Sequence, residues 1–299
     1  MFCFSGYRNC DNIGGNILMR NNNKDNPNKG LSFLYNNFLG RILLKPLVAW
    51  PLVSNIAGWF LNRRISTIFI KPFVRKNNIN MEEFIETSYK SFNDFFIRKI
   101  KEEKRKVSNN IKDFISPCDS KLTCYEIKKD LLINVKNSKY SVNSILNDDT
   151  LAKEYNNGYL LVFRLSPEDY HRYHFIDDGT YIKNYKIKGK YHTVNPIVYD
   201  KYEVFKENSR EVSILKTNNF DKVVYVEVGA LLVGKIKNIK KEGNFKKKEE
   251  KGHFMYGGST VILLVKKNII KIDDKIMKNS KEMIETPVKY GEVIAKKIN

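Results

Sequence analysis

The sequence is poor in cysteine, has a deficit of acidic residues, and contains no long apolar segment. Its 299 residues include four cysteines, whose spacing does not match a metal-binding finger: Cys3, Cys10, Cys118 and Cys124. This favours a protein that faces a reducing, cytosolic compartment. The first twenty residues lack an apolar core, so no secretory signal is apparent.

Charge is strongly one-sided. Lysine and arginine number 53 against 33 acidic residues, a net charge of +20. Nucleic acid, an anionic membrane surface or acidic substrates would each suit this excess, and so would a merely solvated surface. Because no helix-turn-helix or finger spacing organises the basic residues, we predict no nucleic-acid partner. Residues 46–61 carry no charge, but two prolines and Asn55 make them too broken to span a bilayer.

Composition divides the chain into three parts. Residues 1–30 are polar and Asn-rich and are predicted to be a flexible lead-in. Residues 31–106 are predicted to be helical, with apolar residues at helical spacing and both tryptophans, Trp50 and Trp59, close to basic residues. This mixture suits helices that lie in a membrane interface, and the alternative is a helical cap on its own domain. Asn80 is predicted to cap a helix that begins at Met81.

Residues 107–299 are predicted to form a β-rich catalytic domain, which makes the fold class α+β. Turn residues separate short segments with the alternation of strands. The predicted strands are 121–127, 131–135, 158–165, 181–188, 211–216, 222–228, 230–237 and 259–265, with a last one near 288–295.

Ser259 lies where a glycine pair meets the last long apolar run. The simplest interpretation is a turn serine that bonds its own backbone before a buried strand. The alternative is self-cleavage, in which the hydroxyl attacks the carbonyl of Gly258, since glycine tolerates the backbone that exposes this carbonyl. Such a reaction needs a base for the hydroxyl and an acid to orient that base.

Candidates for the base are few, because the chain has only four histidines, at 171, 174, 192 and 253. Ser166, Pro167 and Asp169 form a helix-start pattern, which predicts a short helix with His171 and His174 on one face. The pair could be surface residues, zinc ligands without a third partner, or the base for Ser259. Asp119, after Pro117, is the candidate acid, although an aspartate there can also bond its own turn.

Together these motifs resemble those of the pyruvoyl-dependent phosphatidylserine decarboxylases, from about residue 31 to the C-terminus. The matching segments are Phe92-Asn93-Asp94-Phe95-Phe96-X-Arg98, Ser116-Pro117-Cys118-Asp119, Tyr170-His171-Arg172-Tyr173-His174, Val194-Asn195-Pro196, Val228-Gly229-Ala230 through Val233-Gly234-Lys235-Ile236, Gly252-X-Phe254 and Gly258-Ser259-Thr260. The sequence departs from the family at Ser120, which usually is glycine, and at Gly257, where the best-known members have a larger apolar residue.

The resemblance implies a mechanism. Asp119 would orient His174, and His174 would take the proton of Ser259. Cleavage after Gly258 would give a large chain, 1–258, and a small chain, 259–299, that stay together. Ser259 would become the pyruvoyl cofactor, which forms a Schiff base with phosphatidylserine and releases CO2 to leave phosphatidylethanolamine, with His171 assisting. No metal is implied.

The resemblance also implies a location, with the enzyme docked peripherally on the cytoplasmic face of the cell membrane, on anionic lipid. A homo-oligomer is compatible with the sequence. Three other functions share some of these features: a non-catalytic basic membrane-binding module, a pyruvoyl decarboxylase of a soluble amino acid, and a serine hydrolase that does not cut itself.

Overall fold

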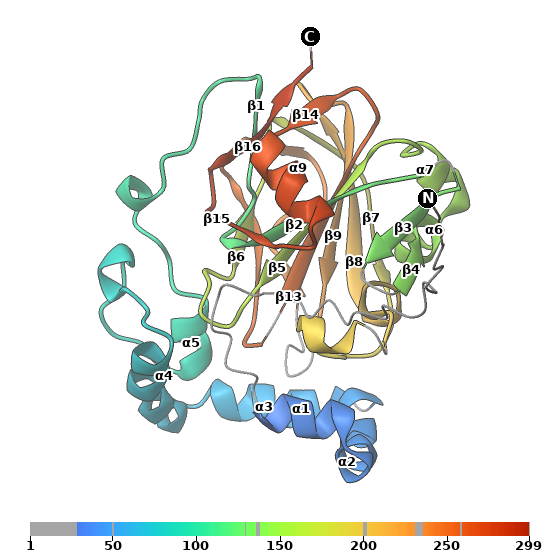
Figure 1. Cartoon of the computed structure of the whole chain (residues 1–299). Helices are drawn as coiled ribbons and strands as arrows, with labels where there is room; N and C mark the ends of the chain where they lie inside the picture. Colours follow the sequence, from blue (N-terminus) through green and yellow to red (C-terminus); the bar gives the residue numbers. More distant parts are fainter. Residues whose placement is uncertain are drawn as a thin grey trace, which may run out of the picture.

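The structure is a computed structural model that describes residues 29–49, 51–128, 130–135, 138–199, 202–230, 236–257 and 259–298. Its centre is an antiparallel sheet of eight strands in the order β11-β7-β8-β9-β13-β5-β2-β15 (Figure 1). Nearly all of the predicted lead-in, up to residue 28, lies outside the described residues, as do residues 231–235 of the predicted strand 230–237. Because helices at one end accompany a large antiparallel sheet, the fold is α+β, as predicted.

Most predicted strands are confirmed to within two residues at each end. The large sheet contains β2 (Ser120–Glu126), β5 (Tyr159–Leu165), β7 (Gly179–Ile187), β8 (Arg210–Thr217), β9 (Lys222–Val228), β11 (Asn244–Phe245), β13 (Ser259–Val265) and β15 (Thr286–Val288). Smaller sheets contain β1 (Asp113–Ile115), β14 (Ile270–Ile272) and β16 (Val293–Lys297), then β6 (Arg172–His174), β10 (Ile236–Asn238) and β12 (Glu250–Phe254), and the hairpin of β3 (Leu132–Val135) and β4 (Ser138–Ser141).

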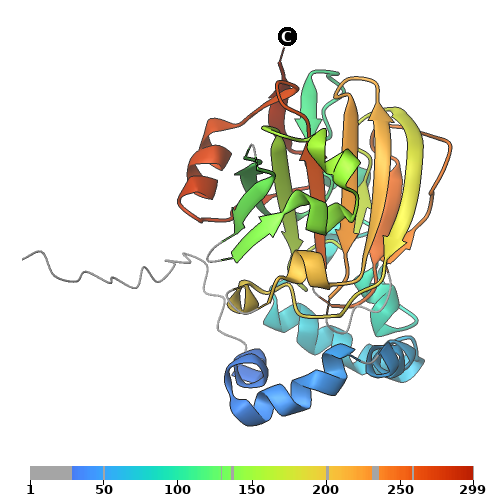
Figure 2. The ribbon, with the colours of Figure 1, turned by 90° about the vertical axis from the view of Figure 1, so that its right-hand side faces the viewer.

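The helices are α1 (Lys29–Asn36), α2 (Phe38–Ala49), α3 (Pro51–Leu61), α4 (Ile70–Lys76), α5 (Phe92–Phe96), α6 (Val142–Leu146), α7 (Asp149–Lys153), α8 (Val204–Glu207) and α9 (Asp274–Lys281). Short 3-10 helices are η1 (Arg64–Phe69), η2 (Met81–Glu83), η3 (Glu102–Lys104) and η4 (Pro196–Val198). Helices α1 to α4 lie at one end of the sheet (Figure 2). Within the described residues, no helix is long and apolar enough to cross a membrane.

Strand β13 is buried along its whole length because both faces of the sheet are covered. Val261 and Leu263 pack in the core on one face, with residues of the smaller sheets and of α9. Ile262 and Leu264 pack in the core on the other face, with residues of α6, α7 and α8. An uninterrupted aliphatic run is what a strand buried on both faces requires.

Two predicted helices are wrong. Asn80 does cap the next segment, accepting from the Glu82 peptide NH at 3.1 Å, but only the 3-10 turn η2 follows. The segment after Ser166 is a turn and then strand β6, because its backbone pairs with β12 instead of closing helical bonds. His171 and His174 therefore do not share the face of a helix.

A buried ion pair joins β12 to the main sheet, and it generates a stability prediction. Lys251 and Glu227 have fully buried side chains whose Nζ and Oε1 lie 2.7 Å apart. Removing one partner leaves an uncompensated buried charge, so Lys251→Met and Glu227→Leu should each lower the free energy of unfolding by about 3–5 kcal/mol. The double variant should lose less than the sum. Urea denaturation of all four proteins measures this, and additive losses would contradict it.

Candidate active site

Ser259 is the first residue of β13, and its side chain is fully buried. Pairing of β13 with β5 sets Ser259 opposite Leu165, beside the turn that begins at Ser166. This turn brings His171 back to the sheet, and the Ser259 Oγ lies 3.3 Å from His171 Nδ1. Sheet register thus joins a serine and a histidine that are far apart in the sequence. Gly258, the predicted cleavage residue, lies outside the described residues.

The tautomer of His171 follows from its second contact. Its Nε2 lies 2.9 Å from the carbonyl oxygen of Ser166, which can only accept a hydrogen bond. Nε2 therefore carries the proton, and Nδ1 is free to accept the hydrogen bond of the Ser259 hydroxyl. The ring is also fixed by stacking on Phe96, at a centroid distance of 4.0 Å.

His171 is a weak base in this environment. Burial, and then the positive charge of Arg98, lower the pKa of His171 to about 3. Arg98 is itself buried under the Phe84 and Phe95 rings and donates to the carbonyl oxygen of Glu168 at 3.1 Å. Burial lowers the Arg98 pKa to about 10, so the guanidinium keeps its charge at neutral pH. His171 can hold the serine hydroxyl, but its imidazolium form is strongly disfavoured.

His174 stacks on one aromatic ring and lies near a second. Its ring stacks on Tyr290 at a centroid distance of 3.8 Å, with Tyr170 on a nearly parallel plane at 6.0 Å. Among the described residues, nothing hydrogen-bonds its buried Nδ1. Burial lowers the His174 pKa to about 4, while the negative charges of Glu250 and Asp119 act in the opposite direction. A buried ring nitrogen without a partner is free to take a proton.

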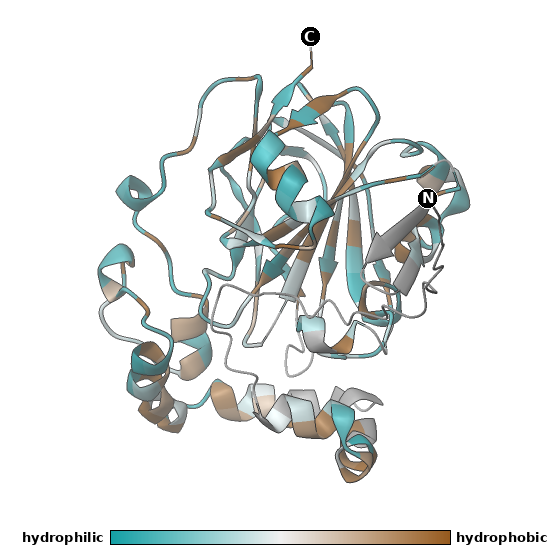
Figure 3. Ribbon diagram, in the orientation of Figure 1, coloured by the Kyte–Doolittle hydropathy of each residue, from teal (hydrophilic) through white to brown (hydrophobic). Residues whose placement is uncertain are grey.

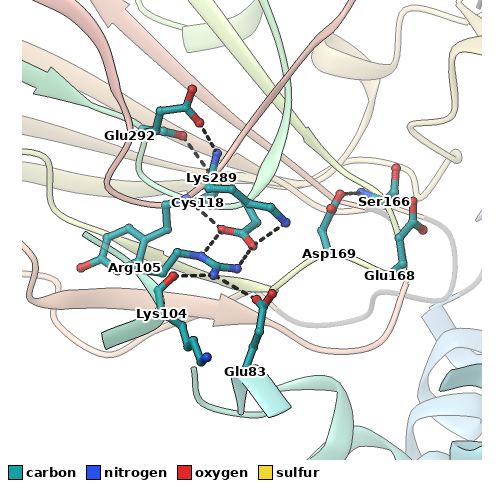
Figure 4. A network of polar contacts seen from close by, with 12 residues as sticks. Glu83, Lys104, Arg105, Cys118, Ser166, Glu168, Asp169, Lys289 and Glu292 are labelled. Atoms are coloured by element: carbon teal, nitrogen blue, oxygen red, sulfur yellow. Dashed lines mark hydrogen bonds and ion pairs between the residues drawn. The ribbon is translucent and has the colours of Figure 1, made fainter. Parts of the chain in front are cut away.

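Asp119 is buried and bound by groups from two parts of the chain, Arg105 and the pair Lys289 and Tyr290. Its carboxylate accepts from Arg105 Nη2 at 2.5 Å, from Lys289 Nζ at 3.2 Å and from the Tyr290 peptide NH at 2.8 Å. Figure 4 shows the side chains of Arg105, Lys289 and Glu83 in this network. Burial raises the Asp119 pKa, but the Arg105 hydrogen bond and the Lys289 charge outweigh it, so the pKa lies below its ordinary value and the carboxylate is ionised.

The predicted relay from Asp119 through His174 to Ser259 is not closed by direct hydrogen bonds among the described residues. The serine contacts His171, and Asp119 meets His174 indirectly, since it holds the peptide NH of the Tyr290 that stacks on His174. The sequence placed Arg98 in a segment that matches the family but gave it no role in the site. Sequence reasoning missed Arg105 and Tyr290.

A buried serine whose hydroxyl meets a histidine ring nitrogen is the arrangement found in proteins that use the serine as a nucleophile. The model of the family described as phosphatidylserine decarboxylase matches residues 92–296. The chain is 51% identical over 271 residues to phosphatidylserine decarboxylase proenzyme 2 of Clostridium acetobutylicum, which covers 91% of this chain and 93% of the relative. A phosphatidylserine decarboxylase proenzyme of Clostridium botulinum (strain Langeland) is 43% identical over 274 residues, 90% and 93% of the two chains. The chain belongs to the phosphatidylserine decarboxylase family.

The two buried histidines predict a pH-dependent stability. Their folded pKa values, about 3 and about 4, lie below the ordinary 6.5, so between these values the unfolded chain binds more protons. The contribution of these two histidines to the free energy of unfolding is therefore fully present above about pH 6.5 and is lost as the pH falls toward their folded pKa values. His174→Gln should flatten the dependence of the free energy of unfolding by up to about 1.4 kcal/mol per pH unit. Denaturation from pH 7 to 4 tests this, and parallel curves would contradict it.

Proposed function

We propose that this chain is a phosphatidylserine decarboxylase that cuts itself between Gly258 and Ser259. The observation that carries the proposal is the buried Ser259 hydroxyl, held 3.3 Å from His171 at the start of the central strand. The names of its relatives support it, because each is called a phosphatidylserine decarboxylase proenzyme, and a proenzyme matures by processing. We expect this processing at the peptide bond between Gly258 and Ser259, because Ser259 is the serine of this site.

Self-cleavage begins when Ser259 Oγ attacks the carbonyl carbon of Gly258. An ester C–O bond forms, the peptide C–N bond breaks, and the hydroxyl proton passes through a base to the released amine. Loss of the Cα proton then breaks the Cβ–O bond, which frees the Gly258 carboxylate and leaves dehydroalanine. Addition of water releases ammonia and gives the pyruvoyl group.

The two histidines divide this work. His171 orients the Ser259 hydroxyl but is a poor base beside Arg98, because the guanidinium opposes a second positive charge. Nothing in the described part of the chain hydrogen-bonds His174 Nδ1, and two carboxylates favour the charged form of His174, so it is the better proton acceptor once it approaches the hydroxyl. Asp119 positions His174 through Tyr290.

A pyruvoyl group at residue 259 suits this site, because the position is buried and a histidine ring nitrogen faces it. Its carbonyl would take up the amine of phosphatidylserine and accept the electrons released with CO2. His171 would then lie where it can assist the return of a proton to the former α-carbon. The product would be phosphatidylethanolamine.

The two chains made by cleavage should remain one complex. β13 would belong to the small chain, yet it hydrogen-bonds along its length with β5 and β9 of the large chain. β15 and β16 would likewise stay paired with β2 and β1. Separation would expose the centre of both cores.

Intact mass under denaturing conditions tests the cleavage. The wild-type protein should give two chains that divide after Gly258, with the smaller one blocked at its N-terminus and lighter than a serine-started peptide. Ser259→Ala should give one full-length chain. His174→Ala should slow cleavage at least about 100-fold, the usual contribution of a general base, and His171→Ala should slow it less while abolishing CO2 release. A wild-type chain of full mass would overturn the mechanism, and normal cleavage by His174→Ala would overturn the assignment of the base.

The helical end of the molecule supports a membrane-docking role. Exposed apolar side chains gather on α1, α2, α3 and η1, and hydrophobic segments are visible on α2 and α3 in Figure 3. They include Phe33, Phe38, Leu39, Ile42, Leu43, Ile56, Trp59, Phe60, Ile65, Ile68 and Phe69. Exposed Arg63, Arg64 and Arg75 lie among them. Apolar side chains with basic neighbours are typical of a surface that lies on anionic lipid.

Vesicle sedimentation tests the docking. Trp59→Ser combined with Phe60→Ser should weaken binding to phosphatidylglycerol vesicles at least about tenfold, since two large exposed apolar side chains leave the interface. Raising the salt concentration should weaken wild-type binding as well. Ile111→Ser, at a site that is 63% exposed and outside the helical region, is the matched control and should bind normally. Binding that ignores both the double substitution and salt would contradict this role.

A further inference from the structure

Helix α5 contacts both the segment before Ser259 and the helices at the end of the molecule. It has only five residues, Phe92–Phe96, and Ser91 caps its start. Its residues Phe92, Phe95 and Phe96 are all buried. The Phe92 peptide NH donates to Ser66 Oγ of η1 at 2.9 Å. The helix therefore rests on the same elements that carry the exposed apolar side chains.

Asn93, in α5, makes the contact with the segment before the predicted cleavage bond. It is 2% exposed, and its Oδ1 accepts from the Tyr256 peptide NH at 3.1 Å. Its Nδ2 donates to Asn62 Oδ1 at 3.0 Å, and Gly58 O of α3 lies 3.5 Å away. Because the acceptors beside α3 take the NH2 group, the amide oxygen must face Tyr256.

The Tyr256 side chain also packs against α5. Its ring lies edge-on to Phe92 and Phe96, each with a centroid distance of 5.1 Å. Phe96 also stacks on His171, which holds the Ser259 hydroxyl. One short helix thus fixes the peptide two residues before Gly258 and the histidine that faces the nucleophile.

We propose that Asn93 is a positioning residue for self-cleavage. Its amide oxygen fixes residue 256, in the segment that leads to the predicted cleavage bond, and its amide nitrogen ties that segment to α3. The inference rests on the proposed self-cleavage, and it adds a residue with no part in proton transfer. A misplacement of about 1 Å in the attacked carbonyl is enough to slow such a reaction strongly.

The test follows cleavage of the full chain over time after cell-free synthesis. Asn93→Ala should slow cleavage at least about tenfold. Asn93→Asp keeps an oxygen acceptor for the Tyr256 peptide NH but cannot donate to Asn62 and Gly58, so it should recover only part of the rate. Asp94→Ala is the matched control, because Asp94 also bonds a peptide NH, that of Lys90 at 2.8 Å, from the same helix but without contact to Tyr256. It should cleave at the wild-type rate.

Two further measurements separate positioning from a loss of folding. The melting temperatures of Ser259→Ala precursors with and without Asn93→Ala show how much the fold suffers. Hydroxylamine cuts an ester but not an amide, so no trapped ester should accumulate in Asn93→Ala if the first attack is the slowed step. Equal slowing by Asn93→Ala and Asp94→Ala, or a wild-type rate for Asn93→Ala, overturns the inference. A wild-type chain that never cleaves overturns the proposed function instead.

Discussion

The antiparallel pairing of β13 with β5 and β9 is the constraint on which the site depends. It places Ser259 at the end of the central strand, opposite Leu165, and the chain after Leu165 turns at Ser166 to bring His171 against the serine. A shift of one residue in this register would move Ser259 to the other face of the sheet. The aliphatic run that follows Ser259 sets this register, because each of its residues must fill one of two cores.

Burial decides the electrostatics of the site as well. Both site histidines are neutral because the interior opposes their charged forms, and the buried charge of Arg98 adds to the effect at His171. Asp119 escapes protonation only because Arg105 and Lys289 bind it. The site therefore combines a neutral histidine pair with an ionised carboxylate, which binds the peptide NH of the Tyr290 whose ring stacks on His174.

The sequence was informative where local pattern and burial agree. Alternating and continuous apolar segments located β5, β9 and β13, and the glycine pair located the start of β13. The helix expected after Ser166 failed because the start pattern formed only its first turn: Ser166 N does donate to Asp169 Oδ2 at 2.8 Å, but pairing with β12 then prevails. The contact of His171 rather than His174 with Ser259 depends on this tertiary pairing, and so does the binding of Asp119 by Lys289, 170 residues away.

The central position of β13 has a consequence for how the protein matures. Residues 259–298 supply β13 to the middle of the sheet and β16 to a flanking one, so the chain must complete its topology before Ser259 meets His171. In an incomplete or misfolded chain Ser259 does not contact His171, and residue 259 would remain an unmodified serine. Under the proposed self-cleavage, the reactive group would be made only in molecules that have already folded, and the cut would then remove the covalent link between the two parts of the sheet. Maturation of this kind would activate only correctly folded molecules. Two cleaved chains that unfold would have to refold without the peptide bond that joined them.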